Sequence, residues 1–180
     1  MKKDKVDWSK GLYSQEKLDG MFANIIVGSK KEVLSRSGST FPLEPFKDII
    51  ENIEVFLDED SKDLVFHGEL VVYQSNELLK REIGNGILNS LLKTGEFDSS
   101  QYQIRFIAWD VVSYKEFFED KVSKVPYKDR FLTIQNLFND EDFPVSSCPT
   151  RIVYSFEEAK AHYKQLALEG KEGTILKTPN

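Results

Sequence analysis

The sequence contains very little cysteine and histidine, which limits the chemistry open to it. Cys148 is the single cysteine, so neither an intrachain disulfide nor a cysteine-rich zinc site can form. The two histidines, His67 and His162, are too few to make a histidine-based metal site without other ligands. A reducing compartment is therefore expected.

Long hydrophobic runs and an apolar leader are also missing from the sequence. Residues 1–5 read MKKDK and lead to Trp8 and polar residues, and no stretch approaches the ~20 apolar residues that cross a bilayer. We therefore expect a cytoplasmic protein with no membrane partner.

An excess of positive charge is lacking as well. The net charge is -6 and the pI is near 5.1, so any binding of phosphate must come from a local basic cluster. With 180 residues, 40% of them hydrophobic and 12% aromatic, the chain can bury a real core. It suits one compact domain, or one large and one small lobe.

Hydrophobic patterning predicts strands and helices without internal repeats. Strands are predicted over 13–17, 22–27, 32–36, 64–73, 103–112 and 174–177. The first three suggest a meander in which Lys17 lies at a strand end. Helices are predicted over 46–57, opened by Pro45, and over 86–92 and 127–138.

Ser155 and Glu158 form a capping box for one more helix, which Gly170 closes. Strands come in runs instead of alternating regularly with helices. The predicted fold class is therefore α+β, with largely antiparallel β-sheets flanked by helices.

The segment Lys17-Leu18-Asp19-Gly20 has the most chemical meaning. A lysine close to an aspartate-glycine turn is the central motif of enzymes that attach a nucleotide to their own lysine. Alone, such a match arises by chance in on the order of a few per cent of chains this long, and it is typical of a hairpin turn. A lysine is almost wholly protonated near neutrality, so a nucleophilic lysine needs burial or neighbouring positive charge, for which bound magnesium is a source.

Four further clusters follow this segment, each at an end or turn of a predicted strand. They are Ser35-Arg36-Ser37-Gly38, Phe66-His67-Gly68-Glu69-Leu70, Phe106-Ile107-Ala108-Trp109-Asp110 and Glu172-Gly173-Thr174-Ile175-Leu176-Lys177. In this order and spacing the five clusters resemble the adenylation domain of ATP-dependent DNA ligases. That domain belongs to the covalent nucleotidyltransferase superfamily, with RNA ligases and mRNA capping enzymes.

The resemblance runs from about Tyr13 to the last residue. Within it, Arg81 and the segments 85–93 and 127–130 look like those of T-even bacteriophage DNA ligases. The implied fold is an ATP-grasp-like nucleotidyltransferase domain, and the implied ligands are ATP, Mg²⁺ and nicked double-stranded DNA. A monomer is implied, in the host cytoplasm if the protein is encoded by a phage.

The resemblance implies a reaction in three steps. Lys17 would attack the α-phosphate of ATP, release pyrophosphate and keep AMP as a phosphoramidate. AMP would move to the 5′-phosphate at a nick in DNA, and the 3′-hydroxyl would displace it. Positioning and charge neutralisation do most of the work in such phosphoryl transfers.

The same resemblance assigns residues to the nucleotide site. Its expected members are Gln15, Glu16, Lys17, Arg36, Glu69, Trp109, Ile175 and Lys177. Glu69 and Glu172 would hold the ribose hydroxyl and the divalent metal, because carboxylate oxygens suit magnesium. Trp109 and Ile175 would cover the two faces of adenine.

The remaining assignments concern polar side chains. Gln15 would read the adenine amino group, and Lys177 would add positive charge near the α-phosphate. Arg36 would contact ribose or DNA phosphate, and Arg81 would contact DNA. Asp19 would fix the turn and orient Lys17.

Each of these residues also has a purely structural interpretation. Glu69 taken alone is typical of a strand edge facing water, and Trp109 and Ile175 are typical core residues. Arg36, Arg81 and Arg130 are by default solvated or salt-bridging arginines, and His67 is expected to be structural. The acidic residues 58–60 are expected to form a solvated loop.

Two features depart from the family pattern. Phe22 stands five residues after the lysine, where ligases of this kind usually carry an arginine, and Arg36 is the residue expected to compensate. The chain stops at Asn180, so we expect residues 1–180 to be an adenylation domain truncated before the last lysine motif and the C-terminal OB-fold. The alternatives are an RNA ligase or capping-type nucleotidyltransferase, and a non-catalytic nucleotide-binding module.

Overall fold

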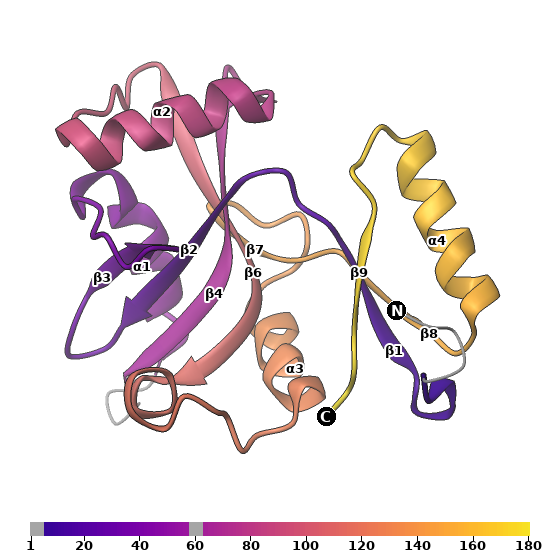
Figure 1. Cartoon of the computed structure of the whole chain (residues 1–180). Coiled ribbons are helices and arrows are strands. Elements are labelled where there is room, and N and C mark those ends of the chain that lie inside the picture. Colours follow the sequence, from indigo (N-terminus) through magenta and orange to yellow (C-terminus); the bar gives the residue numbers. More distant parts are fainter. Residues whose placement is uncertain (1–5, 58–62) are drawn as a thin grey trace.

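The structure is a computed structural model that describes residues 6–57 and 63–180. Figure 1 shows a large lobe, formed by strands β2 to β7 with helices α1 to α3, and a small lobe, formed by β1, β8, β9 and α4. The predicted acidic loop over 58–60 lies outside the described residues. In the described residues, no helix has the length and apolar character needed to cross a membrane.

The large lobe is built on a six-stranded sheet with the order β3-β2-β4-β6-β7, in which β5 also pairs with β4. Its strands are β2 (Met21–Val27), β3 (Glu32–Ser35), β4 (Leu64–Gln74), β5 (Glu77–Leu78), β6 (Tyr102–Ser113) and β7 (Val145–Ser147). All pairs are antiparallel except β6 with β7. The predicted α+β class with largely antiparallel sheets is confirmed.

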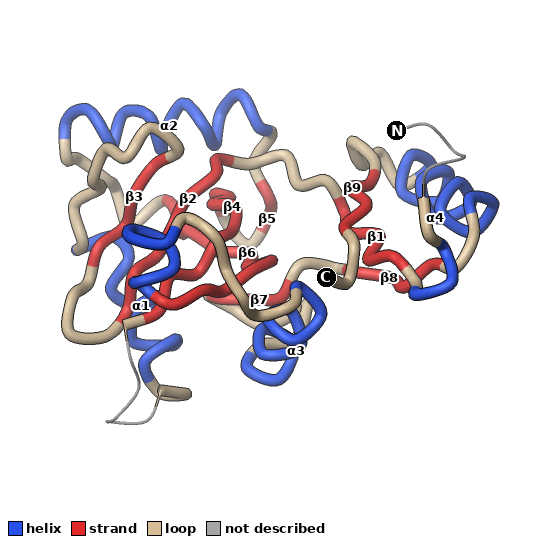
Figure 2. Tube along the Cα trace, turned by 60° about the horizontal axis from the view of Figure 1, so that its bottom comes forward, coloured by secondary structure: helices blue, strands red, loops and turns tan. Residues whose placement is uncertain are grey.

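The small lobe contains a three-stranded sheet with the order β8-β1-β9. Its strands are β1 (Leu12–Glu16), β8 (Thr150–Val153) and β9 (Thr174–Lys177), and helix α4 (Phe156–Leu168) packs against them. Figure 2 shows this sheet apart from the large one. The predicted meander over the first three strands is therefore wrong, because β1 pairs with strands from the other end of the chain.

Residues 17–20 consequently form a crossover between the two sheets instead of a hairpin turn. Local periodicity shows that 13–17 and 22–27 are strands, but it does not show which strands they pair with. The hairpin is formed one step later, where β2 pairs with β3. Lys17 still lies directly after the end of β1, as predicted.

The predicted helices are all present. They are α1 (Lys47–Glu54), α2 (Arg81–Thr94), α3 (Tyr127–Leu137) and α4. Short helical turns cover Trp8–Lys10, Glu44–Phe46 and Glu116–Asp120. Helix α2 begins five residues before the predicted start at Gly86, because Gly84 packs against Val72 of β4 and tertiary contact outweighs low helix propensity. The capping box is confirmed, since Ser155 Oγ accepts a hydrogen bond from the amide of Glu158 at 3.1 Å.

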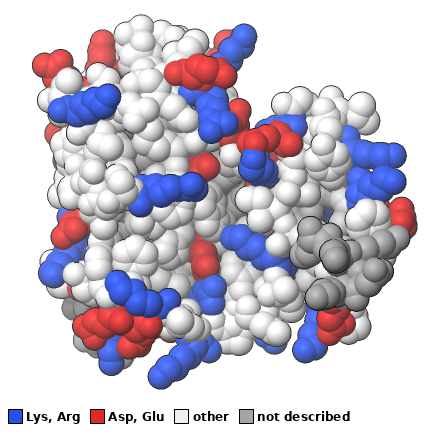
Figure 3. Space-filling model, viewed as in Figure 1, with Lys and Arg blue, Asp and Glu red and all other residues white. Residues whose placement is uncertain are grey.

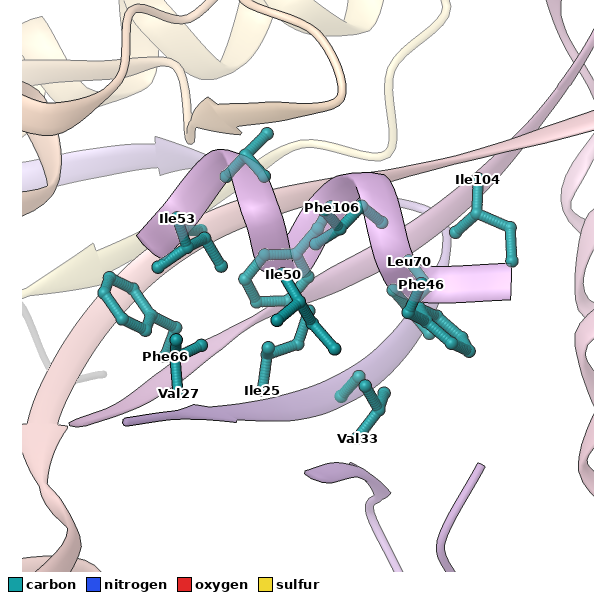
Figure 4. Close-up of a cluster of buried hydrophobic side chains, with 14 of the residues drawn as sticks. Ile25, Val27, Val33, Phe46, Ile50, Ile53, Phe66, Leu70, Ile104 and Phe106 are labelled. Atoms are coloured by element: carbon teal, nitrogen blue, oxygen red, sulfur yellow. The ribbon is translucent and has the colours of Figure 1, made fainter. Parts of the chain in front are cut away.

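The apolar stripe predicted for the first helix packs on the large sheet (Figure 4). Ile50 and Ile53 lie against Ile25, Phe66 and their neighbours, and all four are at most 4% exposed. Each such side chain contributes about 1.5–3 kcal/mol through burial. The small lobe has its own cluster around Leu12, so the two sheets have separate cores.

Two glycines, Gly20 and Gly68, allow neighbouring segments of the large lobe to approach each other closely. A Cβ at Gly68 would lie 2.5 Å from the backbone oxygen of Ile107, and the β4–β6 pairing shifts register beside it. A Cβ at Gly20 would overlap the backbone oxygen of Leu70 and lie 2.8 Å from Cγ of Glu69. The crossover is therefore pressed against β4 next to Glu69.

We predict that Gly20→Ala lowers the free energy of unfolding by about 1–3 kcal/mol, as expected for an added methyl group in a filled space. Urea unfolding followed by circular dichroism measures the change. The matched control is Gly86→Ala in α2, where the added Cβ has no described atom within 4 Å apart from its chain neighbours and the backbone of its own helix. The control should be neutral or stabilising by up to about 1 kcal/mol. Equal effects of the two substitutions would contradict the close packing at Gly20.

Candidate active site

A cavity of about 220 Å³ lies between the two sheets, and we call it the first cavity. Its lining residues are Gln15, Glu16, Lys17, Leu18, Arg36, Glu69, Trp109, Cys148, Ile175 and Lys177. The eight residues expected for the nucleotide site are all among them, although they come from segments far apart in the chain. In Figure 3 the face seen in Figure 1 is hollowed between the lobes, with charges of both signs beside the hollow.

Lys17 lies where the small lobe meets the crossover. Its amide donates a hydrogen bond to the backbone oxygen of Gly173 at 2.8 Å, which continues the β1–β9 ladder. Its Nζ contacts Oε1 of Glu172 as an ion pair, and the two side chains are 46% and 37% exposed. The pairing of the first and last strands thus brings together two residues 155 positions apart.

Glu69 is a carboxyl group whose charge is disfavoured. Burial raises the pKa of Glu69 to about 7; Asp19 and Glu172 add to the rise, and Arg36 and Arg81 oppose it. Its Oε2 atom is buried and has no hydrogen-bond partner in the described part of the chain. This carboxyl group is therefore available to a ligand, and it is partly protonated near neutral pH.

Trp109 on β6 and Ile175 on β9 both line the first cavity, one from each lobe. Ile175 is 44% exposed, which argues against the interpretation of this residue as core. Trp109 is fixed through its backbone oxygen, which accepts a hydrogen bond from the hydroxyl of Tyr127 at 2.9 Å. Nothing in the sequence near Trp109 indicates this support, because Tyr127 comes from the first turn of α3.

Lys177 lies beside Trp109, with Nζ 5.5 Å from the ring centre of Trp109 and 4.7 Å from that of Tyr127. Burial lowers the pKa of Lys177 to about 8, Arg130 adds to this effect, and Asp110 opposes it. The cavity therefore holds one amine and one carboxyl group whose pKa values are both shifted by burial.

Gln15 and Glu16 extend the wall along β1. Gln15 is 2% exposed, and its Nε2 donates a hydrogen bond to Oγ1 of Thr150 at 3.1 Å. Glu16 pairs with Lys171, whose Nζ is 2.8 Å from Oε1 of Glu16. Both side chains are thereby held in place before any ligand binds.

Phe22 and Arg36 lie together on the large lobe. Phe22 is the register partner of Glu69 in the β2–β4 pair, and its ring is 5.9 Å from that of Trp109. The guanidinium of Arg36 lies over the Phe22 ring at 5.5 Å, a cation–π arrangement. Phe22, which stands where the resemblance leads us to expect an arginine, therefore supports another arginine at the cavity wall.

Glu172 and Arg81, which the resemblance also assigns to the site, do not line the first cavity, and neither do Arg130 and His67. Arg81 pairs with Asp19, its Nη1 being 3.0 Å from Oδ1, which also fixes the crossover. Arg130 makes a two-pronged ion pair with Asp110 at 2.7 and 2.9 Å, so it is a salt-bridging helix residue. His67 is structural as expected, since its Nδ1 is 2.6 Å from Oδ1 of Asn24 in the large sheet.

In the described residues, no group of three or more His, Cys, Asp or Glu side chains is placed to hold a metal. Magnesium is commonly bound through one or two carboxylates, with phosphate and water oxygens completing its shell. The unpartnered Oε2 of Glu69 fits such an ion, and Glu172 lies at the ion pair with Lys17.

Residues 4–180 match the family described as ATP dependent DNA ligase domain. The DNA ligase of Enterobacteria phage T4 is 30% identical over 97 residues, which are 54% of this chain and 20% of the phage protein. The DNA ligase of Enterobacteria phage T6 gives the same identity and coverage. This chain therefore spans about a fifth of the curated relatives it matches.

Solved structures show the same fold. The ATP-dependent DNA ligase from bacteriophage T7, solved in complex with ATP, has a TM-score of 0.66 at 19% identity. The similarity covers 95% of this chain and 57% of that one. The fold, the five ordered clusters and the family match over nearly the whole sequence agree, and the chain belongs to the family of ATP-dependent DNA ligase domains.

Proposed function

We propose that this chain performs the self-adenylation step of a DNA ligase, with Lys17 as the nucleophile. The observation that carries the proposal is the position of Lys17, at the wall of a cavity that also contains Glu69, Trp109 and Lys177. A nucleophile, an aromatic platform and groups with shifted pKa values in one cavity are typical of an active site.

The proposed step forms one bond and breaks one bond. The ammonium group of Lys17, which pairs with Glu172, first loses one proton to solvent. The uncharged amine then donates its lone pair to the α-phosphorus of ATP, and the bond from that phosphorus to the bridging oxygen breaks. The electron pair of the broken bond leaves with pyrophosphate. The surplus amine proton passes to Glu172, whose Oε1 contacts Nζ, and the product is a lysyl-AMP phosphoramidate.

The surrounding residues bind and orient the nucleotide in this proposal. Trp109 and Ile175 cover the faces of adenine, and Gln15 reads its amino group. Glu69 accepts a ribose hydroxyl, and Lys177 adds positive charge near the α-phosphate. Magnesium, held by Glu69 and Glu172 when bound, supplies neutralisation of the phosphate charge.

For the whole enzyme we propose transfer of AMP to the 5′-phosphate of nicked double-stranded DNA, followed by displacement by the 3′-hydroxyl. Arg36 and Arg81 are the proposed DNA contacts, and both are exposed cations near the site. We propose a monomer that acts in the host cytoplasm, and the similarity to DNA ligases of phages T4 and T6 supports this location. A second candidate function is that of a non-catalytic nucleotide-binding module. It is favoured by Phe22, which stands where the resemblance to ligases leads us to expect an arginine.

We predict that Lys17→Ala abolishes covalent labelling of the chain by ATP labelled at the α-phosphate, measured in a denaturing gel with magnesium present. The control is Lys164→Ala, an exposed lysine on α4, which should label as the unchanged chain does. ATP binding in the unchanged chain without label that depends on Lys17 would favour the non-catalytic module. A stronger label from GTP than from ATP would favour a capping-type enzyme.

A second prediction concerns Glu69 and pH. Because its pKa in the folded chain lies above the ordinary value, the folded state binds the proton more tightly than the unfolded state does. The stabilisation is therefore full below about pH 4.5 and is lost as the pH rises through about 7. Glu69→Gln should remove this dependence and be more stable than the unchanged chain at pH 8, by about 1–2 kcal/mol after solvent screening.

Urea unfolding between pH 5 and pH 8 tests this prediction. The control is Glu96→Gln, a substitution of an exposed carboxyl group, which should leave the pH profile unchanged. Parallel profiles for Glu69→Gln and the unchanged chain would show that Glu69 titrates normally and would remove the argument for a desolvated carboxyl in the site.

A further inference from the structure

The side chain of Gln15 ends in an amide, which carries a hydrogen-bond acceptor and a donor on one group. Its oxygen Oε1 accepts hydrogen bonds, and its nitrogen Nε2 donates two. An amide that is free to turn over can therefore recognise either an amino group or a carbonyl group on a base. Gln15 is 2% exposed and lines the first cavity, so its contacts within the protein decide which of the two atoms a ligand meets.

The hydroxyl of Thr150 determines one of these contacts. Its Oγ1 donates its only hydrogen to the backbone oxygen of Cys148 at 2.7 Å. The same Oγ1 lies 3.1 Å from Nε2 of Gln15 and, because its hydrogen is used, it can only accept there. Thr150 and Gln15 are register partners in the β8–β1 pair, so the backbone ladder keeps the two side chains together. Turning the amide over would set Oε1 against a second acceptor and would cost the bond to Cys148.

Tyr127 accepts from the same amide on the side of the large lobe. Its hydroxyl donates to the backbone oxygen of Trp109 at 2.9 Å, so toward Gln15 it too can only accept. Burial raises the pKa of Tyr127, and a hydrogen bond from the side chain of Gln15 opposes this rise, as a donor to the phenol oxygen does. Both hydrogens of Nε2 are thus directed at protein acceptors, and Oε1 is the polar atom of the amide that remains for a ligand.

We propose that Thr150 is a specificity-determining residue of this site, because it turns Oε1 of Gln15 toward the base and so selects a purine with an amino group at position 6. This inference rests on the proposed function, in which Trp109 and Ile175 cover the faces of the base. Adenine has an amino group at position 6, which donates to Oε1. Guanine and hypoxanthine have a carbonyl oxygen there, so two acceptors would face each other and both would lack a partner.

Thr150 acts through Gln15 in this proposal, since it does not itself line the first cavity. It is therefore a positioning residue, and its role is separable from simple packing. Loss of packing at Thr150 would weaken the binding of all purine nucleotides alike. Loss of its hydroxyl alone leaves the Gln15 amide free to turn over and offer Nε2 to a carbonyl oxygen, which changes the ratio between nucleotides.

Isothermal titration calorimetry of the whole chain with AMP and with inosine monophosphate tests the inference. We expect the unchanged chain to prefer AMP by about 10-fold or more. Thr150→Val keeps the shape of the side chain without the hydroxyl, and it should lower this preference about fivefold or more, as expected for one hydrogen bond. Thr150→Ser retains the hydroxyl and should keep the preference within about twofold.

Two further variants complete the test. Thr150 is only partly buried, and Thr150→Ala is the second variant without a hydroxyl, with the same expected loss of preference if Thr150→Val does not fold. Thr133→Val is the matched control. Thr133 is exposed on α3, its hydroxyl also donates to a backbone oxygen, that of Asp129 at 3.1 Å, and its replacement should leave the preference unchanged.

The outcomes distinguish this inference from the proposed function. An equal preference for AMP in the unchanged chain and in the variants without a hydroxyl overturns the inference, and so does an equal loss of binding for both nucleotides. An unchanged chain that binds AMP without preferring it also overturns the inference, while the proposed function stands. No AMP binding by the unchanged chain, together with no label on Lys17, overturns the proposed function and this inference with it.

Discussion

Backbone hydrogen bonds from β1 to β8 and β9 hold the small lobe together and determine where Lys17 lies. The strands come from opposite ends of the chain, with Gln15 and Thr150 separated by 135 positions. These ladders place Glu172 against Lys17 and bring Ile175 into the lining of the cavity that Trp109 also lines. Loss of the β1 pairing would therefore dismantle the first cavity without any change in the residues that line it.

Desolvation shapes the chemistry of this cavity more than ion pairing does. Burial raises the pKa of Glu69 and lowers that of Lys177, so each group is less charged near neutral pH than it would be in water. Oε2 of Glu69 is left without a protein partner among the described residues. Glu69 can therefore still form a hydrogen bond with a ligand, and its unpartnered oxygen lowers the stability of the folded chain.

The eight residues expected for the nucleotide site could be named from the sequence, because the five ordered clusters resemble the adenylation domain of DNA ligases, and they line one cavity. The partners of β1 were not, since alternation of apolar residues reports burial and not pairing. Strands β7 and β8 have only three and four residues, too short for a periodic signal. Thr150 opens β8, so its contact with the side chain of Gln15 could not be predicted either.

The close contact of Gly20 with β4 has a consequence for motion. The crossover joins the lobes and is held against β4 at this point, beside Glu69. Three peptide units separate Lys17 from Gly20, so their Cα atoms lie at most about 11 Å apart however the lobes move. This short tether limits how far the lysine can move away from the carboxyl group of Glu69.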